Sequence, residues 1–247
     1  MNWLFPDWPA PVNVKAVITT RQGGVSRHPY ASMNLADHVG DEPADVERNR
    51  AILMDRLALP LAPYWLSQVH GCRVVDAEAT FPGAEADAIC ARRPGYVCPI
   101  LTADCLPLLI CDRAGTSVCA VHAGWRGLAD GIIENALCRL GLPAADLLVW
   151  LGPAIGPQAF EVGEDVYDAF VSEKPEAKAA FSASHPGHWL ADIYLLARQR
   201  LAALGVGYVG GGEYCTVTDR ERFFSYRRDG VTGRMASLIW LEPEEIS

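Results

Sequence analysis

Three residues of the sequence carry side chains that can do chemistry, and each stands where an apolar segment breaks into small and polar residues. They are His70 in "QVHG", Cys105 in "TADC" and His122 in "VHAGWRG". The segments around Cys105 and His122 have the pattern of two strands joined by a short turn at "RAG". With a turn centred near residues 113 and 114, Cys105 and His122 lie directly opposite each other, with Cβ atoms about 5 Å apart.

That spacing fits two chemistries and one purely structural arrangement. One cysteine and two histidines can bind a single Zn²⁺ and leave a fourth position open, which is the pattern of a catalytic zinc site. A thiol beside an imidazole is also a nucleophile beside its base. Alternatively, Cys105 is a core cysteine and the histidines are buried and hydrogen-bonded. The sequence contains no HExxH, HxH or HxE with PCxxC signature, so spacing alone leaves all three open.

Two glycine-containing segments are candidate anion-binding loops. "HAGWRG" leads into a predicted helix that begins near Leu128, and Arg126 would place a cation close to His122. A glycine-rich turn with Trp125 packed in the core explains the same segment equally well. "RQGGVS" is the second candidate, with Arg21 beside it. Neither segment matches the glycine motifs of P-loop or Rossmann nucleotide-binding sites.

The elements that must position these residues are a mixture of strands and helices. Apolar periodicity and helix-terminal residues predict helices over 41–59, 128–141, 164–173 and 189–204. Strand-like segments are predicted at the N-terminal side of "RQGGVS" and over 64–77, 95–112, 116–124, 146–157, 208–216 and 235–243. The elements do not alternate strictly as βαβ units, and the two strands around residue 114 read as an antiparallel hairpin. We therefore expect α/β layers around a mixed sheet.

Length, charge and cysteine content narrow the class of protein. The 247 residues suit one large domain, taken here as 1–247, and the net charge is −9 with no Lys/Arg-rich run, which argues against a nucleic-acid partner. We expect no membrane association, since no apolar run approaches the roughly 20 residues of a membrane span. We read no signal peptide at the N-terminus and expect the eight cysteines to be free thiols of a cytoplasmic protein.

A series of short motifs resembles the laccase-domain, or polyphenol-oxidase-like, family, whose members are also described as peptidoglycan editing factors and as purine nucleoside phosphorylases. "TADC" followed by "HAGWRG" is the most specific part of the resemblance, which extends from about residue 17 to residue 241. One departure is Gln158 in "GPAIGPQ", where the family usually has cysteine. The other matching motifs are "RQGGVS", "ASMNL", "HVGD", "ERNR", "QVHG", "ADAIC", "FEVG" and "FFSYRRDGVTGRMA".

The resemblance implies a fold, a cofactor and an activity. The implied fold is a single-domain, three-layer α/β/α arrangement with a mixed sheet, similar to the cysteine-hydrolase-like fold of deamidating toxins. His70, Cys105 and His122 would bind one zinc, although copper has also been proposed. The implied reactions are phosphate-dependent cleavage of adenosine, inosine and methylthioadenosine, and deamination of adenosine. Asn34 and Arg50 would lie in the substrate pocket, and a monomer is expected.

Other functions stay open at this point. A multicopper oxidase needs many histidines, mostly in HxH pairs, whereas this chain has six histidines and no such pair. A single bound copper would still allow weak phenol oxidation, because Cu(II) binds most sites more tightly than Zn(II). A hydrolase that uses Cys105 and a histidine on cell-wall precursors is a further alternative. So is a non-catalytic protein that binds such precursors.

Overall fold

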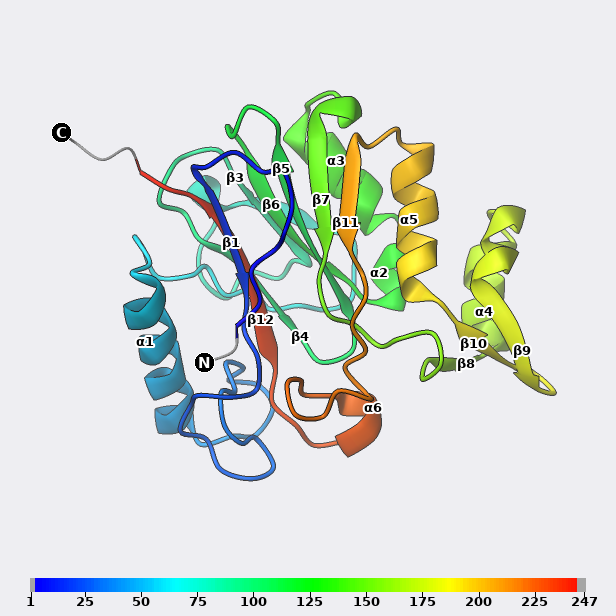
Figure 1. Ribbon diagram of the computed structural model, residues 1–247, viewed down its shortest axis with the longest axis horizontal. Coiled ribbons are helices and arrows are strands. Elements are labelled where there is room, and N and C mark those ends of the chain that lie inside the picture. Colours follow the sequence, from blue (N-terminus) through cyan, green and yellow to red (C-terminus); the bar gives the residue numbers. More distant parts are fainter. Residues whose placement is uncertain (1–2, 244–247) are drawn as a thin grey trace.

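The computed structural model describes residues 3–243, and its centre is a six-stranded mixed sheet (Figure 1). The strand order is β11-β7-β5-β6-β3-β2. Neighbouring strands are antiparallel except for the pairs β11–β7 and β2–β3, which are parallel. The expected α/β fold with a mixed sheet is therefore confirmed. The strands are β2 (Val74–Asp76), β3 (Ala88–Ala91), β5 (Leu106–Asp112), β6 (Val118–Ala123), β7 (Leu147–Leu151) and β11 (Tyr208–Gly211).

A second sheet covers one face of the central sheet. Its strands are β1 (Val14–Ile18), β12 (Met235–Leu241) and β4 (Cys98–Thr102), with β12 in the middle and both pairings antiparallel. Apolar side chains from the two sheets share one core cluster, and helix α1 (Pro43–Leu57) packs on the outer face of the smaller sheet. This extra layer between the central sheet and α1 was not among the features expected from the sequence.

Helices cover the opposite face of the central sheet. These are α2 (Trp125–Ala129), α3 (Ile132–Leu140) and α5 (Ile193–Ala203), and their buried residues share a core with β5, β6 and β7. Helix α4 (Glu164–Val171) lies at one side of the molecule with a three-stranded sheet (Figure 1). Its strands are β8 (Glu161–Gly163), β9 (Phe181–His185) and β10 (His188–Ala191).

The remaining helical elements are short. Helix α6 (Tyr226–Asp229) precedes β12, and three 3₁₀ helices occupy Ala77–Ala79, Ala144–Asp146 and Pro175–Ala180. Among the described residues, no helix is both long enough and apolar enough to cross a membrane.

Two of the four predicted helices differ from the structure for local reasons. The helix predicted over 189–204 begins at Ile193, because the Asp192 carboxylate caps it by accepting the Leu195 N–H at 2.9 Å. The residues before Asp192 pair as β10 instead. The helix predicted over 128–141 begins earlier, at Trp125, and is divided at Gly131, whose φ of 92° is incompatible with a continuous helix.

The predicted segment 95–112 is also divided, and the division carries Cys105. Strand β4 belongs to the smaller sheet and β5 to the central sheet, so residues 103–105 cross from one sheet to the other. The predicted hairpin of β5 and β6 is present, but its register differs by two residues. Pro107 pairs with His122, and Leu106 with Ala123. Cys105 and His122 are therefore diagonal neighbours, still on one face because side-chain direction repeats every two residues.

Candidate metal centre

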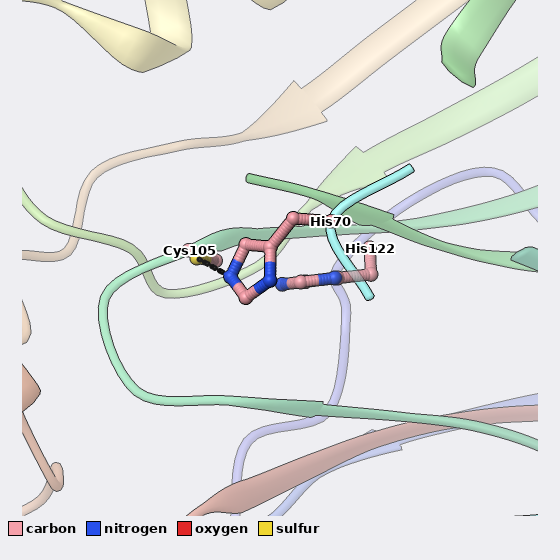
Figure 2. Close-up of side chains that lie close together, drawn as sticks. All are labelled: His70, Cys105 and His122. Carbon is pink, nitrogen blue, oxygen red and sulfur yellow. Dashed lines mark hydrogen bonds between the residues drawn. The ribbon is translucent and has the colours of Figure 1, made fainter. Parts of the chain in front are cut away.

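The three residues singled out in the sequence meet at one place in the structure. Figure 2 shows the His70 ring pointing toward both Cys105 and His122. One ligand atom from each residue lies within 4.8 Å of the other two, and the Cys105 Sγ to His70 Nε2 distance is 3.7 Å. The two imidazole rings are edge-to-face, with centroids 4.8 Å apart. Within residues 3–243 this is the one group of three histidine, cysteine or acidic residues with such spacing.

Cys105 is positioned by its neighbour Asp104, which anchors the crossing between the two sheets. Asp104 has a φ of 90° and is buried. Its carboxylate accepts hydrogen bonds from Thr216 Oγ1 at 2.5 Å, Ser225 Oγ at 3.0 Å and the Arg227 N–H at 2.6 Å. These bonds use both carboxylate oxygens, so Asp104 holds the crossing in place.

Asp87 joins the two histidines. Its fully buried carboxylate accepts the N–H groups of His70 at 2.9 Å and Gly71 at 2.8 Å, and so fixes a loop in which His70 has a φ of 62°. The same carboxylate lies 2.8 Å from His122 Nδ1. Because a carboxylate can only accept, Nδ1 carries the proton and Nε2 is left to bind a metal.

Asp87 was not singled out from the sequence, although it lies in the quoted motif "ADAIC". The available signal is a single acidic residue at the start of an apolar strand. Aspartate is almost never fully buried unless it is paired, so an acid in that position predicts a partner of some kind. The sequence does not say that the partner is His122.

The glycines of "HAGWRG" allow the loop of His70 to approach α2 closely. A Cβ atom at Gly124 would lie 2.8 Å from His70 Cδ2 and 3.2 Å from Cys105 Sγ, and one at Gly127 would lie 2.6 Å from the Gly71 carbonyl oxygen. Real Cβ atoms essentially never come within 3.0 Å of another residue, so the 2.8 and 2.6 Å contacts would force these segments apart. Close packing beside the cluster therefore requires both glycines. This packing explains the glycines of the segment without an anion bound by Arg126.

Cys105 and His122 shift each other's pKa values. Burial raises the pKa of the Cys105 thiol, but the charge of His122 and hydrogen bonds from His122 and His70 outweigh burial and lower the pKa to about 6. Burial lowers the pKa of His122, but the Cys105 charge and the hydrogen bonds to Asp87 and Cys105 raise it to about 9. Without a metal, a thiolate beside an imidazolium is the favoured pair near neutral pH.

The donor set and its spacing fit a zinc ion. Zn–S bonds of about 2.3 Å and Zn–N bonds of about 2.0–2.1 Å at tetrahedral angles place sulfur and nitrogen about 3.5 Å apart. The observed 3.7 Å between Cys105 Sγ and His70 Nε2 is close to that value. The Asp87–His122 hydrogen bond supplies the outer carboxylate that metal-binding histidines commonly have. Thiolate and imidazole donors also suit copper.

Two cavities open onto the cluster, and Cys105 and His70 line both. The larger has a volume of about 470 Å³, and its other lining residues are His38, Gln68, Leu101, Thr102, Ala103, His122, Tyr226 and Arg234. The smaller has a volume of about 260 Å³ and a more aromatic wall. Its other lining residues are Ala103, Asp104, Trp125, Arg126, Ile155, Phe160, Ile193, Tyr226 and Arg227.

The other predicted site residues lie at different distances from the cluster. Arg126 lines the smaller cavity, with its guanidinium 4.3 Å from the centroid of the Trp125 ring. Arg50 does not line either of these two cavities. It lines a third hollow of about 510 Å³, which adjoins the 470 Å³ cavity and shares His38, Gln68 and Leu101 with it.

Asn34 and Arg21 do not line these cavities. Asn34 is fully buried, and its amide donates to the Ala36 carbonyl and to Asp41 while accepting the N–H groups of Ala36 and Arg234. Any effect of Asn34 on a substrate would therefore be indirect. Arg21 of "RQGGVS" lines a separate hollow with His28, Arg220 and Arg228.

Comparison with known proteins assigns the family. The model of the multi-copper polyphenol oxidoreductase laccase family matches residues 15–242. The chain belongs to this family. A Pseudomonas aeruginosa protein named purine nucleoside phosphorylase PA4543 is 56% identical over 241 residues, which cover 97% of this chain and 98% of that protein. Purine nucleoside phosphorylase YfiH of Escherichia coli is 52% identical over 239 residues, 96% of this chain and 98% of the relative.

Solved structures of relatives have the same fold. Neisseria meningitidis protein NMB0706 superposes with a TM-score of 0.95 at 52% identity, covering 98% of this chain and 100% of that one. YlmD from Geobacillus stearothermophilus gives a TM-score of 0.92 at 31% identity, covering 98% and 97% of the two chains. The family and the α/β fold with its mixed sheet are thus established together.

Proposed function

We propose that this protein is a zinc-dependent purine nucleoside phosphorylase that converts adenosine, inosine or methylthioadenosine and phosphate into the free base and a sugar 1-phosphate. The observation that carries the proposal is the His70–Cys105–His122 cluster, placed where two cavities meet. Support comes from relatives named purine nucleoside phosphorylase at 46–56% identity over nearly the whole chain.

The reaction needs two substrates to meet at one carbon atom. A phosphate oxygen forms a bond to the anomeric carbon while the bond from that carbon to the purine nitrogen breaks. The electron pair of the broken bond leaves with the purine, which then takes up a proton. Two cavities that share Cys105 and His70 offer one position for each reactant. A bound zinc would supply a Lewis acid for a substrate oxygen at the open position.

Residues around the centre would bind and orient the substrate. In the smaller cavity, Trp125, Phe160 and Tyr226 offer faces on which a purine can stack, with Arg126 beside them as a donor. Arg50 would contact the part of a substrate that extends into the third hollow. Asn34 would act through the segments that its buried amide holds together.

We include adenosine deamination at the same centre in the proposal. In that reaction water adds its oxygen to C6 of adenine and ammonia leaves, which gives inosine. The chemistry again needs an electrophile held beside a group that activates an oxygen nucleophile. The shared centre predicts that the two activities are lost together when a ligand is removed.

One observation favours a second candidate function. Asp87, His122 and Cys105 form a chain in which a carboxylate orients an imidazole beside a thiol of lowered pKa. That is also the arrangement of a Cys–His–Asp hydrolase. Such an enzyme would act on an amide, for example in cell-wall precursors, without metal. Copper-dependent phenol oxidation has less support, since only one three-ligand group occurs within residues 3–243.

The test is an assay of purified protein with adenosine and phosphate that quantifies adenine, inosine and ribose 1-phosphate. Cys105→Ala is assayed in parallel, with metal content measured for both proteins. We expect ribose 1-phosphate from the wild type in an amount equal to adenine plus hypoxanthine, which is also quantified because inosine from deamination is a substrate, and a folded but metal-free, inactive variant. Full activity of Cys105→Ala would overturn the proposal. If zinc-loaded protein forms no product from adenosine, muropeptide precursors are the substrates to assay next.

A further inference from the structure

The larger cavity beside the cluster contains an arginine without a carboxylate partner. Arg50 pairs with Asp37 and Arg228 pairs with Asp229, but Arg234 has no such partner within residues 3–243. The cavity wall contains no aspartate or glutamate. Cys105 and Asp104 act on Arg234 only through their negative charge, and a partly buried guanidinium that no carboxylate pairs with directly still favours an anionic ligand in this cavity.

The guanidinium of Arg234 is held in place but is only partly used. Nη1 donates to the carbonyl oxygens of Thr232 at 2.8 Å and Gly233 at 3.0 Å. Nε and Nη2 have no hydrogen-bond partner in the part of the chain that the structure describes. They are adjacent donors on one edge of the guanidinium of Arg234, a residue that lines the cavity with Cys105 and His122. Such a pair matches two oxygens of one phosphate.

The backbone around Arg234 is rigid. Its N–H donates to Asn34 Oδ1 at 3.0 Å, and Asn34 itself is fully buried. A Cβ at Gly233 would lie 2.8 Å from both Asn34 Cβ and Phe224 Cζ, so the turn is packed tightly against both residues. Arg234 thus pays little conformational entropy when it binds a ligand. This packing also gives Asn34 an indirect role as a positioning residue.

The arginines of both cavities lie over aromatic rings, with Arg234 5.9 Å from the centroid of the Tyr226 ring, so the cavities differ chiefly in how many aromatic side chains line them. In the smaller one, Arg126 lies over Trp125 and Arg227 over Phe160, with ring centroids 4.3 and 5.6 Å away. Asp104 also contributes a carboxylate to that wall. Arg126, Arg227 and Asp104 leave the smaller cavity with a net positive charge as well, so it is the lining by Trp125, Phe160 and Tyr226 that suits this cavity to a flat purine base.

We propose that Arg234 binds the phosphate co-substrate in the larger cavity, while the purine base lies in the smaller, aromatic cavity. This inference rests on the proposed phosphorylase function and names the residue that recognises its second substrate. Phosphate then approaches the anomeric carbon from the Arg234 side, and the base departs toward Trp125 and Phe160.

The experiment compares Arg234→Gln and Arg234→Lys with Arg126→Gln and with Arg56→Gln, an exposed arginine at the end of α1. KM is measured for phosphate and for inosine separately, on metal-loaded protein. Loss of a charge-assisted donor pair should raise KM for phosphate about ten- to hundredfold in Arg234→Gln. KM for inosine should change by less than about threefold, Arg234→Lys should be intermediate, and Arg56→Gln should match the wild type.

Calorimetric titration with inorganic phosphate alone separates this inference from the proposed function. If the wild type shows no phosphorolysis, phosphate binding that is lost in Arg234→Gln still supports the anion site. Equal phosphate binding by wild type and Arg234→Gln overturns it, as does a rise in KM for phosphate confined to Arg126→Gln. Thermal unfolding of each variant confirms that the comparison is between folded proteins, and Arg234→Lys retains the charge if the glutamine variant does not fold.

Discussion

One buried carboxylate, that of Asp87, connects two of the three candidate metal ligands. It orients the His122 ring through Nδ1 and fixes the backbone of His70 and Gly71. Burial raises the pKa of Asp87, but the hydrogen bonds from His122 and from these N–H groups outweigh burial, so the pKa is lowered. Asp87 is therefore charged at neutral pH and neutralises part of the charge of a bound cation.

Asp87→Asn should weaken zinc binding without unfolding the protein. The amide keeps the shape of the carboxylate. However, its NH₂ group would face an N–H group whose hydrogen bond the carboxylate of Asp87 accepts in the wild type. Loss of such an outer partner typically lowers metal affinity about 10- to 100-fold. A competition titration against a zinc chelator measures the change. Asp112→Asn is the matched control, because Asp112 is also buried but holds the distant β5–β6 turn. Unchanged affinity in Asp87→Asn would show that Asp87 has no role in the centre.

Cys105 should react as a thiolate at unusually low pH once metal is removed. Its pKa of about 6 lies below the usual value for cysteine, near 8.5. The thiolate fraction therefore rises as pH increases through about 6, and alkylation by iodoacetamide should increase between about pH 5 and about pH 7 and then level off. Peptide mass spectrometry locates the modified residue. Zinc-loaded protein should be protected, and a midpoint near 8.5 would contradict the charge pairing with His122.

Cys105 and His122 lie at the ends of strands, whereas His70 lies in a loop. His70 is in the loop before β2, Cys105 follows the crossing from β4 to β5, and His122 is near the end of β6, just before α2. Gly124 lies between β6 and α2, where a Cβ atom would lie within 3.2 Å of both His70 and Cys105. The loop of His70 can therefore pack against β6 and α2 only because residue 124 has no side chain.

Gly124→Ala should remove the metal site while the fold remains. The added Cβ would overlap His70 Cδ2 at 2.8 Å and press on Cys105 Sγ, so the loop of His70 must move away. Such overpacking costs about 1–3 kcal/mol of stability and should abolish zinc binding measured by elemental analysis. Gly187→Ala is the control, since its Cβ would meet nothing within 4 Å although its φ of 77° is strained. That variant should lose some stability but retain zinc.

The sequence predicts the β5–β6 hairpin better than the crossing from β4 to β5 that precedes it. Alternation and turn residues placed Cys105 and His122 on the same face, even though the register was wrong by two residues, because a shift of two preserves the face. The crossing at residues 103–105 was not predictable in the same way. An apolar run reads alike whichever sheet it joins, and β4 pairs with β12, over a hundred residues later. Only the tertiary structure places Asp87 and Arg234 beside the cluster.

At the scale of the whole molecule, the candidate metal centre joins three segments of the chain. They lie near the boundary between two apolar cores. The central sheet and the smaller sheet pack through one apolar cluster, and the central sheet and its helices pack through another. Cys105 marks the crossing between the sheets, whereas His122 belongs to the central sheet and His70 to a loop. A metal bound by all three residues stabilises the native arrangement, because the unfolded chain does not bring the ligands together.

Removal of metal should therefore lower the melting temperature of the whole protein. At a free zinc concentration about 1,000 times Kd, linkage contributes about 4 kcal/mol, which corresponds to roughly 10 °C for a protein of this size. Scanning calorimetry with and without chelator measures the difference. Cys105→Ala should melt at the same temperature in both conditions, whereas Cys138→Ser, at an exposed cysteine, should keep the full shift. Equal melting temperatures of metal-loaded and chelated wild type would mean that zinc does not bind the native fold at this centre, and the metal-free Cys–His–Asp arrangement would then be the functional one.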